Sequence, residues 1–255
     1  MDRWLLLSAT LLALIGGARG MLAVHQGRRS HSTLLWMIAA IACQIAFLAI
    51  RGELRCVCPL KDWGERLAFL SWALTLFYLL VGPAYRISLL GVFTAPVVVL
   101  LQSIALLPGV LQANPEKFPD GNLWHEMHSA TSVLAYGALA LAAIAGVMFL
   151  VLDHQLKEHH LKSGLFRNLP PVRELLVSLE RLLWLGGGLL SLGILAGFLM
   201  PHDKHATAHL FAALSIWTSY GVLIGVKSAR GLTGRRLSIL TVSLFILSIG
   251  VFAFV

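Results

Sequence analysis

Long apolar runs are the feature that most constrains how this chain can fold. The sequence holds eight of them, each close to the roughly 20 helical residues that cross a hydrocarbon core about 30 Å thick. The chain is 58% hydrophobic and only 13% charged, which separates it from soluble globular proteins. The runs are Trp4–Leu22, Thr33–Ile50, Leu67–Gly82, Ile87–Leu107, Ser129–Leu152, Leu182–Met200, Ala206–Val226 and Leu237–Val255.

These runs predict an all-α integral membrane protein, a bundle of eight transmembrane helices in a single polytopic domain covering residues 1–255. Transmembrane strands are excluded because barrels show short alternating segments instead of unbroken apolar stretches. The first run is interpreted as a retained span, since the apolar stretch is long for a signal peptide and only Arg3 precedes it as a basic residue.

The distribution of basic residues predicts the orientation. One set of alternate loops holds thirteen Lys and Arg residues and the other set holds seven. The positive-inside rule places the richer set in the cytoplasm, so both termini and the loops before the fifth and seventh runs are expected outside. The loop 51–66 opposes this trend with four basic residues, although Glu53, Asp62 and Glu65 accompany them. The net charge of +8 is interpreted as topology and attraction to an anionic leaflet, not nucleic acid binding.

Cysteine and glycine positions add smaller expectations. Cys56 and Cys58 flank one residue of the loop 51–66, a spacing that matches neither the redox C-x-x-C pattern nor a usual zinc site. They are interpreted as incidental or loop-bracing thiols, with a redox or ligand role as the alternative. Glycines within the sixth run, Gly193 and residues 186–188, are expected to let helices approach closely.

Histidines gather where the fifth and seventh runs begin. The first cluster is Trp124-His125-Glu126-Met127-His128, and the second holds His202, His205 and His209. Residues three or four apart share a face of a helix, so each cluster could direct an imidazole inward from a different helix at a similar depth. Ionisable side chains held near the bilayer are usually functional, which makes these clusters the best functional indication in the sequence.

Two chemical readings of the histidines are open. Two imidazoles on opposite sides of a flat cavity are what six-coordinate haem iron requires, and aromatic side chains would form its walls. Those aromatic candidates are Trp124, Tyr136, Trp217 and Tyr220. The alternative is a divalent metal carrier, because the His205-x-x-x-His209 spacing suits zinc with His125 or His128 as a third ligand. The H-E-x-x-H, G-x-S-x-G and phosphate-loop patterns are absent, so no hydrolase or nucleotide chemistry is indicated.

Several stretches resemble the cytochrome c assembly protein family, the CcsA/ResC-like superfamily. The segment 59–72, PLKDWGERLAFLSW, is similar to the family pattern P-L-x-N-x-Y-E-S-L-x-F-L-x-W, with Asp62 and Gly64 in place of the usual Asn and Tyr. The matching positions in that segment are Glu65, Leu67, Phe69, Leu70 and Trp72. The following Leu90-Gly91-Val92-Phe93 and Pro96 resemble the family's L-G-x-x-x-x-P.

Later motifs extend the resemblance over residues 50–250. His128 stands eight residues before Tyr136, as does the family histidine that is read as an axial haem ligand. Leu156-Lys157 resembles the family's Q-L-K ending of that span. The family spacing W…G-W-R-G-R-R is resembled by Trp217, Gly231, Gly234, Arg235 and Arg236, with Leu232 where tryptophan is usual.

The resemblance points to the shorter HemX-like or YpjD-like branch, because FLMPHDKHATAH precedes the seventh run where larger members carry a tryptophan-rich motif. It implies a multi-pass protein of the bacterial inner membrane that holds haem non-covalently near the outer face. His128 and His209 are the implied axial ligands, with His209 favoured over His205.

The implied role is haem handling in cytochrome c maturation, as an assembly factor more than an enzyme. The implied partners are lipid, haem, and other maturation proteins or apocytochrome c. A HemX-like regulator of haem biosynthesis is the near alternative, and a purely structural membrane subunit is the simplest one.

Overall fold

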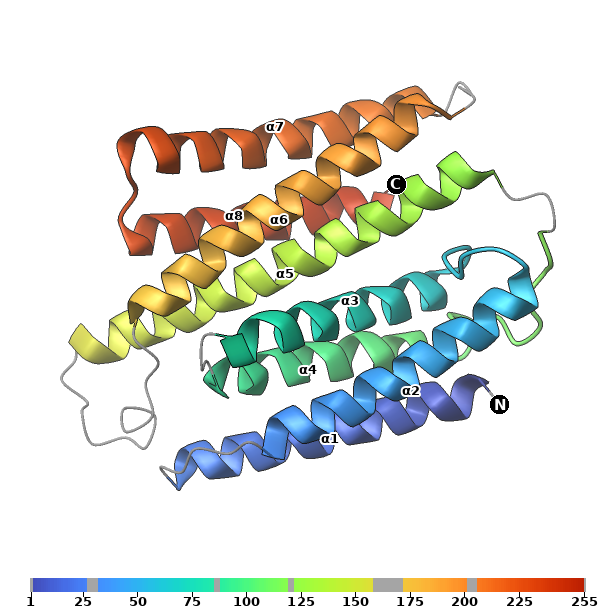
Figure 1. The fold of residues 1–255 in the computed structure, drawn as a ribbon, viewed down its shortest axis with the longest axis horizontal. Helices are drawn as coiled ribbons and strands as arrows, with labels where there is room; N and C mark the ends of the chain where they lie inside the picture. Colours follow the sequence, from blue (N-terminus) through green and yellow to red (C-terminus); the bar gives the residue numbers. More distant parts are fainter. Residues whose placement is uncertain are drawn as a thin grey trace. The chain divides into compact units, whose positions relative to one another are not determined.

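The structure is a computed structural model that describes residues 2–26, 32–84, 88–118, 122–157, 172–200 and 206–254. These residues form α-helices joined by short connections (Figure 1). The helices are α1 (Asp2–His25), α2 (Ser32–Arg55), α3 (Trp63–Ala84), α4 (Ser88–Ala105), α5 (Leu123–Lys157), α6 (Val172–Phe198), α7 (Ala206–Arg230) and α8 (Gly234–Phe254). Each expected run lies within or overlaps one of these helices, which confirms the all-helical class.

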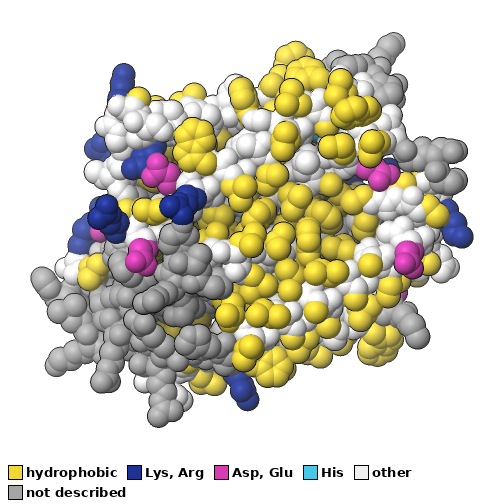
Figure 2. Space-filling view, in the orientation of Figure 1, with side chains coloured by type: hydrophobic (Ala, Val, Ile, Leu, Met, Phe, Trp, Pro, Cys, Tyr) yellow, Lys and Arg dark blue, Asp and Glu magenta, His cyan; other side chains and the backbone are white. Residues whose placement is uncertain are grey.

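Several of these helices can cross a bilayer by length and composition. Within the described residues, six helical spans qualify: Asp2–His25, Thr33–Arg55, Trp63–Val81, Leu123–Lys157, Arg173–Phe198 and Leu210–Arg230. In α4, the stretch Leu90–Ala105 is a shorter apolar helix. On the face shown in Figure 2, hydrophobic side chains cover the middle and charged side chains gather toward the two ends. This is the surface of a multi-pass membrane protein, while the count of eight crossings and the orientation of the termini stay predictions.

The helices group into two compact units, each with its own packing. Unit 1 contains α1 to α4, and unit 2 contains α5, α7, α8 and α6 from Leu175 onward. In unit 1, α1 packs on α2 and α4, and α3 packs on α2 and α4. In unit 2, α8 packs on α5 and α7. The expectation of a single domain over 1–255 stays a prediction.

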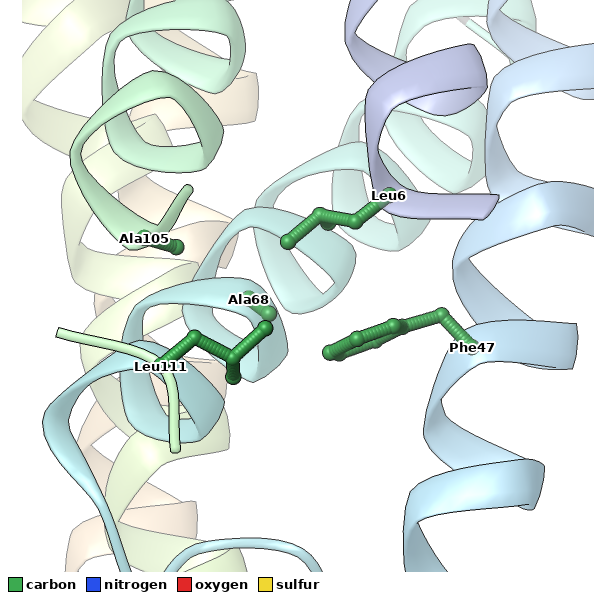
Figure 3. Close-up of a cluster of buried hydrophobic side chains, with 5 residues drawn as sticks. All are labelled: Leu6, Phe47, Ala68, Ala105 and Leu111. Atoms are coloured by element: carbon green, nitrogen blue, oxygen red, sulfur yellow. The ribbon is translucent and has the colours of Figure 1, made fainter. Parts of the chain in front are cut away.

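Side chains from every helix of unit 1 meet in one apolar cluster (Figure 3). Leu6 comes from α1, Phe47 from α2, Ala68 from α3 and Ala105 from α4, and Leu111 joins them from the segment after α4. All five are at most 2% exposed, so this cluster holds the ends of the four helices against one another.

A buried charge network lies at the same end of unit 1. Arg55, the last residue of α2, donates from Nε to Glu65 Oε1 at 2.8 Å and from Nη2 to Asp62 Oδ2 at 3.1 Å. Arg51 Nε lies 3.2 Å from Asp2 Oδ2, and its Nη2 donates to the carbonyl of Gln112 at 2.7 Å. Both guanidinium groups are almost completely buried, so their charges are compensated by carboxylates within the protein rather than by water.

Two of the three carboxylates of this network, Asp62 and Glu65, also cap the beginning of α3. Asp62 Oδ1 accepts from the backbone N–H of Glu65 at 2.6 Å, and Glu65 Oε2 accepts from the N–H of Lys61 at 3.0 Å and of Asp62 at 3.4 Å. This reciprocal arrangement is a capping box with Asp62 as the N-cap. The family motif that carries Asp62 and Glu65 therefore couples the start of α3 to the end of α2.

The helix boundaries differ from the sequence expectation at this loop. The expected external loop 51–66 is shorter in the structure, because α2 continues to Arg55 and α3 begins at Trp63. Arg51 and Arg55 extend the helix because carboxylates neutralise them, which an apolarity criterion does not detect. Cys56 follows α2 with φ of +60°, a left-handed conformation that few residues other than glycine adopt.

Candidate functional site

Unit 2 positions the first histidine cluster by starting α5 early. The Asn122 side chain accepts a hydrogen bond from the backbone N–H of Trp124 at 2.9 Å, which makes Asn122 the N-cap of α5. The helix therefore begins at Leu123, six residues before the apolar run at Ser129. This places Trp124, His125 and His128 on the first turns of a helix instead of on a loop.

The structure separates the two histidines of this cluster. His125 is exposed, whereas His128 is half-buried against α6. The Nδ1 atom of His128 lies 2.7 Å from the carbonyl oxygen of Gly193. A carbonyl oxygen only accepts hydrogen bonds, so Nδ1 is the protonated nitrogen and donates to it. In the neutral ring, Nε2 then carries the free lone pair that could bind a metal.

Two glycines of α6 face the beginning of α5. A Cβ atom built on Gly197 would lie 3.1 Å from Nδ1 and 3.4 Å from Cε1 of His128. One built on Gly193 would lie 3.0 Å from Ser132 Oγ and 3.2 Å from Thr131 Oγ1. The expectation that Gly193 allows close helix approach is confirmed. Gly197 is a second such position, which was not among the glycines expected to do so.

The glycines at 186–188 only partly meet the same expectation. A Cβ on Gly186 would lie 2.6 Å from Leu139 Cδ2 of α5, and one on Gly187 would lie 3.4 Å from Ile224 Cδ1 of α7. At Gly188 a Cβ would have no described atom within 4 Å. Close approach in α6 is therefore required at Gly186 and Gly193, and Gly188 is open.

The aromatic candidates lie in different surroundings. Trp124 is 40% exposed near the beginning of α5. Trp217, equally exposed, donates from Nε1 of α7 to Ser191 Oγ of α6 at 2.7 Å. Tyr136 and Tyr220 are buried, and the Tyr136 hydroxyl donates to the carbonyl of Ser248 in α8 at 3.3 Å. Both tryptophans are thus partly exposed, while Tyr136 helps to hold α5 against α8.

The second histidine cluster is described only in part. His202 and His205 lie outside the described residues, and His209 is in the first turn of α7 with its side chain not described. No group of three or more His, Cys, Asp or Glu side chains that could hold a metal ion occurs among the residues that the structure describes. The metal-carrier hypothesis requires His205 and His209 as ligands. Because neither of these side chains is described, that hypothesis stays a prediction.

The turn that follows α7 contains the glycine of another family motif. Gly231 has φ of +67°, and its N–H donates to the carbonyl of Lys227 at 3.1 Å. This left-handed residue ends α7 and leads into α8, because glycine adopts the conformation without the steric cost that a Cβ imposes. Gly231 therefore has a structural reason to be glycine.

Several known proteins that are similar to this chain carry the same name. The Cytochrome c biogenesis protein CcsA of Nostoc punctiforme is 31% identical over 139 residues, which are 52% of this chain and 39% of that protein. The protein of the same name from Mesostigma viride is 24% identical over 206 residues, covering 70% of this chain and 67% of the relative. That of Microcystis aeruginosa is 25% identical over 239 residues, with 74% and 73% covered.

A family model gives the same assignment. The model described as Cytochrome C assembly protein matches residues 62–254, from the N-cap of α3 to the end of α8. The matched stretch includes Glu65, His128 and Gly231. Because the match covers more than half of the sequence, this chain belongs to the cytochrome c assembly protein family.

Proposed function

We propose that this protein binds haem non-covalently at the end of unit 2 where α5 and α7 begin, with His128 and His209 as axial ligands. Its role would be to hold and orient haem during cytochrome c maturation in the bacterial inner membrane, with that end facing outward. The family assignment and the relatives named for cytochrome c biogenesis support the setting of this proposal.

The hydrogen bond from His128 Nδ1 to the Gly193 carbonyl carries the proposal. Histidines that bind metals usually donate their other ring N–H to a carbonyl or carboxylate, which fixes the ring and raises the basicity of the ligating nitrogen. His128 meets this requirement within the protein itself. His125, one turn earlier, is exposed on the same helix.

The register of α6 and α7 supports His209 as the partner. The Trp217–Ser191 hydrogen bond brings these two residues to the same level on helices that run in opposite directions (Figure 1). Gly197, which faces His128, lies six residues beyond Ser191, or about 9 Å at 1.5 Å per residue. His209 lies eight residues before Trp217, or about 12 Å in the same direction. The backbone of His209 is therefore within about 3 Å of the level of Gly197, which contacts the His128 ring, and about 9 Å beyond the level of Gly193, which accepts its hydrogen bond. The nearness to the level of Gly197 supports two ligands for one haem.

Two aromatic side chains of unit 2 suit a porphyrin. Trp124, near the beginning of α5, and Trp217, at the level of Ser191 about 9 Å from Gly197, are both partly exposed, and aromatic side chains pack well against flat apolar rings. Bound haem would supply the iron redox chemistry, and the protein would supply the binding, the orientation and the shielding of the iron. Covalent attachment to a cytochrome is not assigned to this chain.

Haem content measures the proposal directly. The protein would be purified in mild detergent, titrated with hemin, and compared with His128→Ala and His209→Ala. We expect about one haem per chain for the wild type, a sharp low-spin spectrum after reduction, and loss of that spectrum in both variants. His154→Ala is the matched control, since His154 is an exposed residue in the last turn of the same helix α5.

Other results would overturn the proposal. Wild-type protein that binds no hemin but retains stoichiometric zinc would favour the metal carrier, with His205 and His209 as ligands. Protein that retains neither would favour a structural subunit. A spectrum unchanged by His128→Ala would show that His128 is not an axial ligand, because alanine has no side-chain nitrogen that could bind the iron.

A further inference from the structure

We infer that Gly193 and Gly197 of α6 are positioning residues that hold the His128 ring in one tautomer and one orientation for ligation. The two glycines are called the α6 shelf below. This inference rests on the proposed function and extends it, because it adds a third helix to a site that the histidines place only on α5 and α7.

The α6 shelf acts first through shape. Gly193 and Gly197 are four residues apart, so they share one face of α6, and both face the beginning of α5. At Gly197 the ring of His128 occupies the position next to where a side chain would begin, 3.1 Å from the ideal Cβ. That spacing is tighter than most real Cβ contacts, so a side chain at position 197 would displace the ring by a few tenths of an ångström.

The α6 shelf acts second through hydrogen bonding. The Gly193 carbonyl accepts the Nδ1 proton of His128 at 2.7 Å. A rotation of the imidazole about its bond to Cβ would move Nδ1 away from this oxygen, so the bond selects one ring plane. It also reserves Nε2 for the ligand, since the proton stays on Nδ1.

The shelf also fixes the register of α5 beside the ring. Thr131 and Ser132 lie against Gly193, and the Thr131 hydroxyl donates to the carbonyl of Met127 at 2.6 Å. The approach of Gly193 to Thr131 and Ser132 lies one turn after His128 and brings that turn close to α6, while the Thr131–Met127 bond lies within α5. The carbonyl of Gly193 can therefore reach the ring, which a larger residue at position 193 would prevent by pushing Thr131 and Ser132 away.

The inference concerns these two glycines and not α6 glycines in general. Gly188 of the same helix would accept a Cβ with no described atom within 4 Å. Gly188→Ala is therefore a matched control that adds the same methyl group to the same helix away from the ring. It changes helix propensity by the same amount as the two shelf substitutions.

Gly197→Ala is the main test. Alanine is the better helix former, by about 1 kcal/mol, so loss of folding is not expected from the substitution itself. The added methyl group pushes the His128 ring and lengthens its bond to Gly193. Loss of such an outer-shell partner typically weakens metal affinity by 10–100-fold, so we expect hemin to bind about 10-fold more weakly.

A spectroscopic readout separates positioning from general packing. The g values of low-spin ferric haem depend on the planes of the two axial imidazoles, so a rotated ring shifts them even when haem stays bound. We expect Gly197→Ala and Gly193→Ala, both loaded with hemin, to show shifted g values by electron paramagnetic resonance. Gly188→Ala should match the wild type in g values, hemin affinity and thermal unfolding.

The outcomes distinguish this inference from the function on which it rests. If the wild type binds hemin and His128→Ala abolishes the low-spin signal, but Gly197→Ala leaves affinity and g values unchanged, the shelf is refuted and the haem site stands. If the wild type binds no hemin, the proposed function fails, and the shelf fails with it. If Gly188→Ala shifts the g values as much as Gly197→Ala, the effect is general packing and the shelf is refuted.

Discussion

Glu65→Gln is the substitution that the buried charge network makes most informative. Glu65 is completely buried, and its two oxygens have different partners. Oε1 accepts from Arg55 Nε at 2.8 Å, while Oε2 accepts from the backbone N–H groups of Lys61 and Asp62 at 3.0 and 3.4 Å. A glutamine has one oxygen and one NH₂ group, so in either orientation a donor faces a donor.

The size of the effect follows from these contacts. The change removes one buried negative charge beside the Arg55 and Arg51 guanidinium groups. It also leaves either Arg55 Nε–H or the backbone N–H groups of Lys61 and Asp62 without an acceptor. Breaking a buried ion pair by altering one partner costs about 3–5 kcal/mol, and the lower end applies because glutamine retains one acceptor. For about 3 kcal/mol, the unfolding temperature should fall by about 6–12 °C, at about 2–4 °C per kcal/mol for a chain of this size.

Thermal unfolding in mild detergent, followed by near-ultraviolet circular dichroism, measures this shift. Glu53→Gln is the matched control, because Glu53 is an exposed glutamate near the end of α2 and its replacement should change stability by less than about 0.5 kcal/mol. Equal unfolding temperatures for Glu65→Gln and Glu53→Gln would refute the reasoning, since they would mean that the buried carboxylate contributes no more than a surface one.

Three further predictions test other parts of the molecule. A membrane-impermeant maleimide applied to the outer face of intact cells should label the exposed Cys56, and labelling only after the inner face is opened would reverse the predicted orientation. Trp217→Phe should cost about 1 kcal/mol by removing the bond to Ser191, and Ser191→Ala should add little to it in a double-mutant cycle of unfolding free energies; additive losses would contradict a direct contact. Gly20→Val should destabilise unit 1 by about 1–3 kcal/mol, because even a Cβ there would lie 2.5 Å from Thr33 Oγ1, and unchanged thermal unfolding would show that α1 does not pack this closely.

Much of the helical arrangement could be predicted because lipid imposes one rule. A backbone in hydrocarbon must satisfy its own hydrogen bonds, so a long apolar run has the helix as its main solution. The runs beginning at Trp4 and Thr33 accordingly lie within α1 and α2. Helix ends were less predictable, because they depend on polar caps such as Asn122, which apolarity does not register.

The buried charge network was not predictable from the same criterion. Arg51 and Arg55 were counted as loop charges because isolated arginines are costly inside a membrane protein. Their burial depends on Asp62 and Glu65 beyond the turn and on Asp2 at the start of the chain. The D-x-x-E spacing of a capping box at residues 62–65 was the available local signal, and it indicated the start of α3 but not the pairing with α2.

The role of His128 as a haem ligand stays a prediction from the family resemblance, which rests on its position eight residues before Tyr136. The structure adds that its ring packs against α6. No pattern around His128 names Gly193 or Gly197 as its neighbours, because that contact depends on the crossing of two helices. The G-x-x-x-G spacing at 193–197 indicates a close helix contact, but not which residue fills it.

The identity of the iron ligands is the most direct test of the central claim. Protein labelled with ¹⁵N-histidine and loaded with hemin would be measured by electron–nuclear double resonance in the oxidised state. The proposed site predicts two strongly coupled histidine nitrogens in the wild type and one in His128→Ala. Two such nitrogens persisting in His128→Ala, or none in the wild type, would contradict ligation by His128.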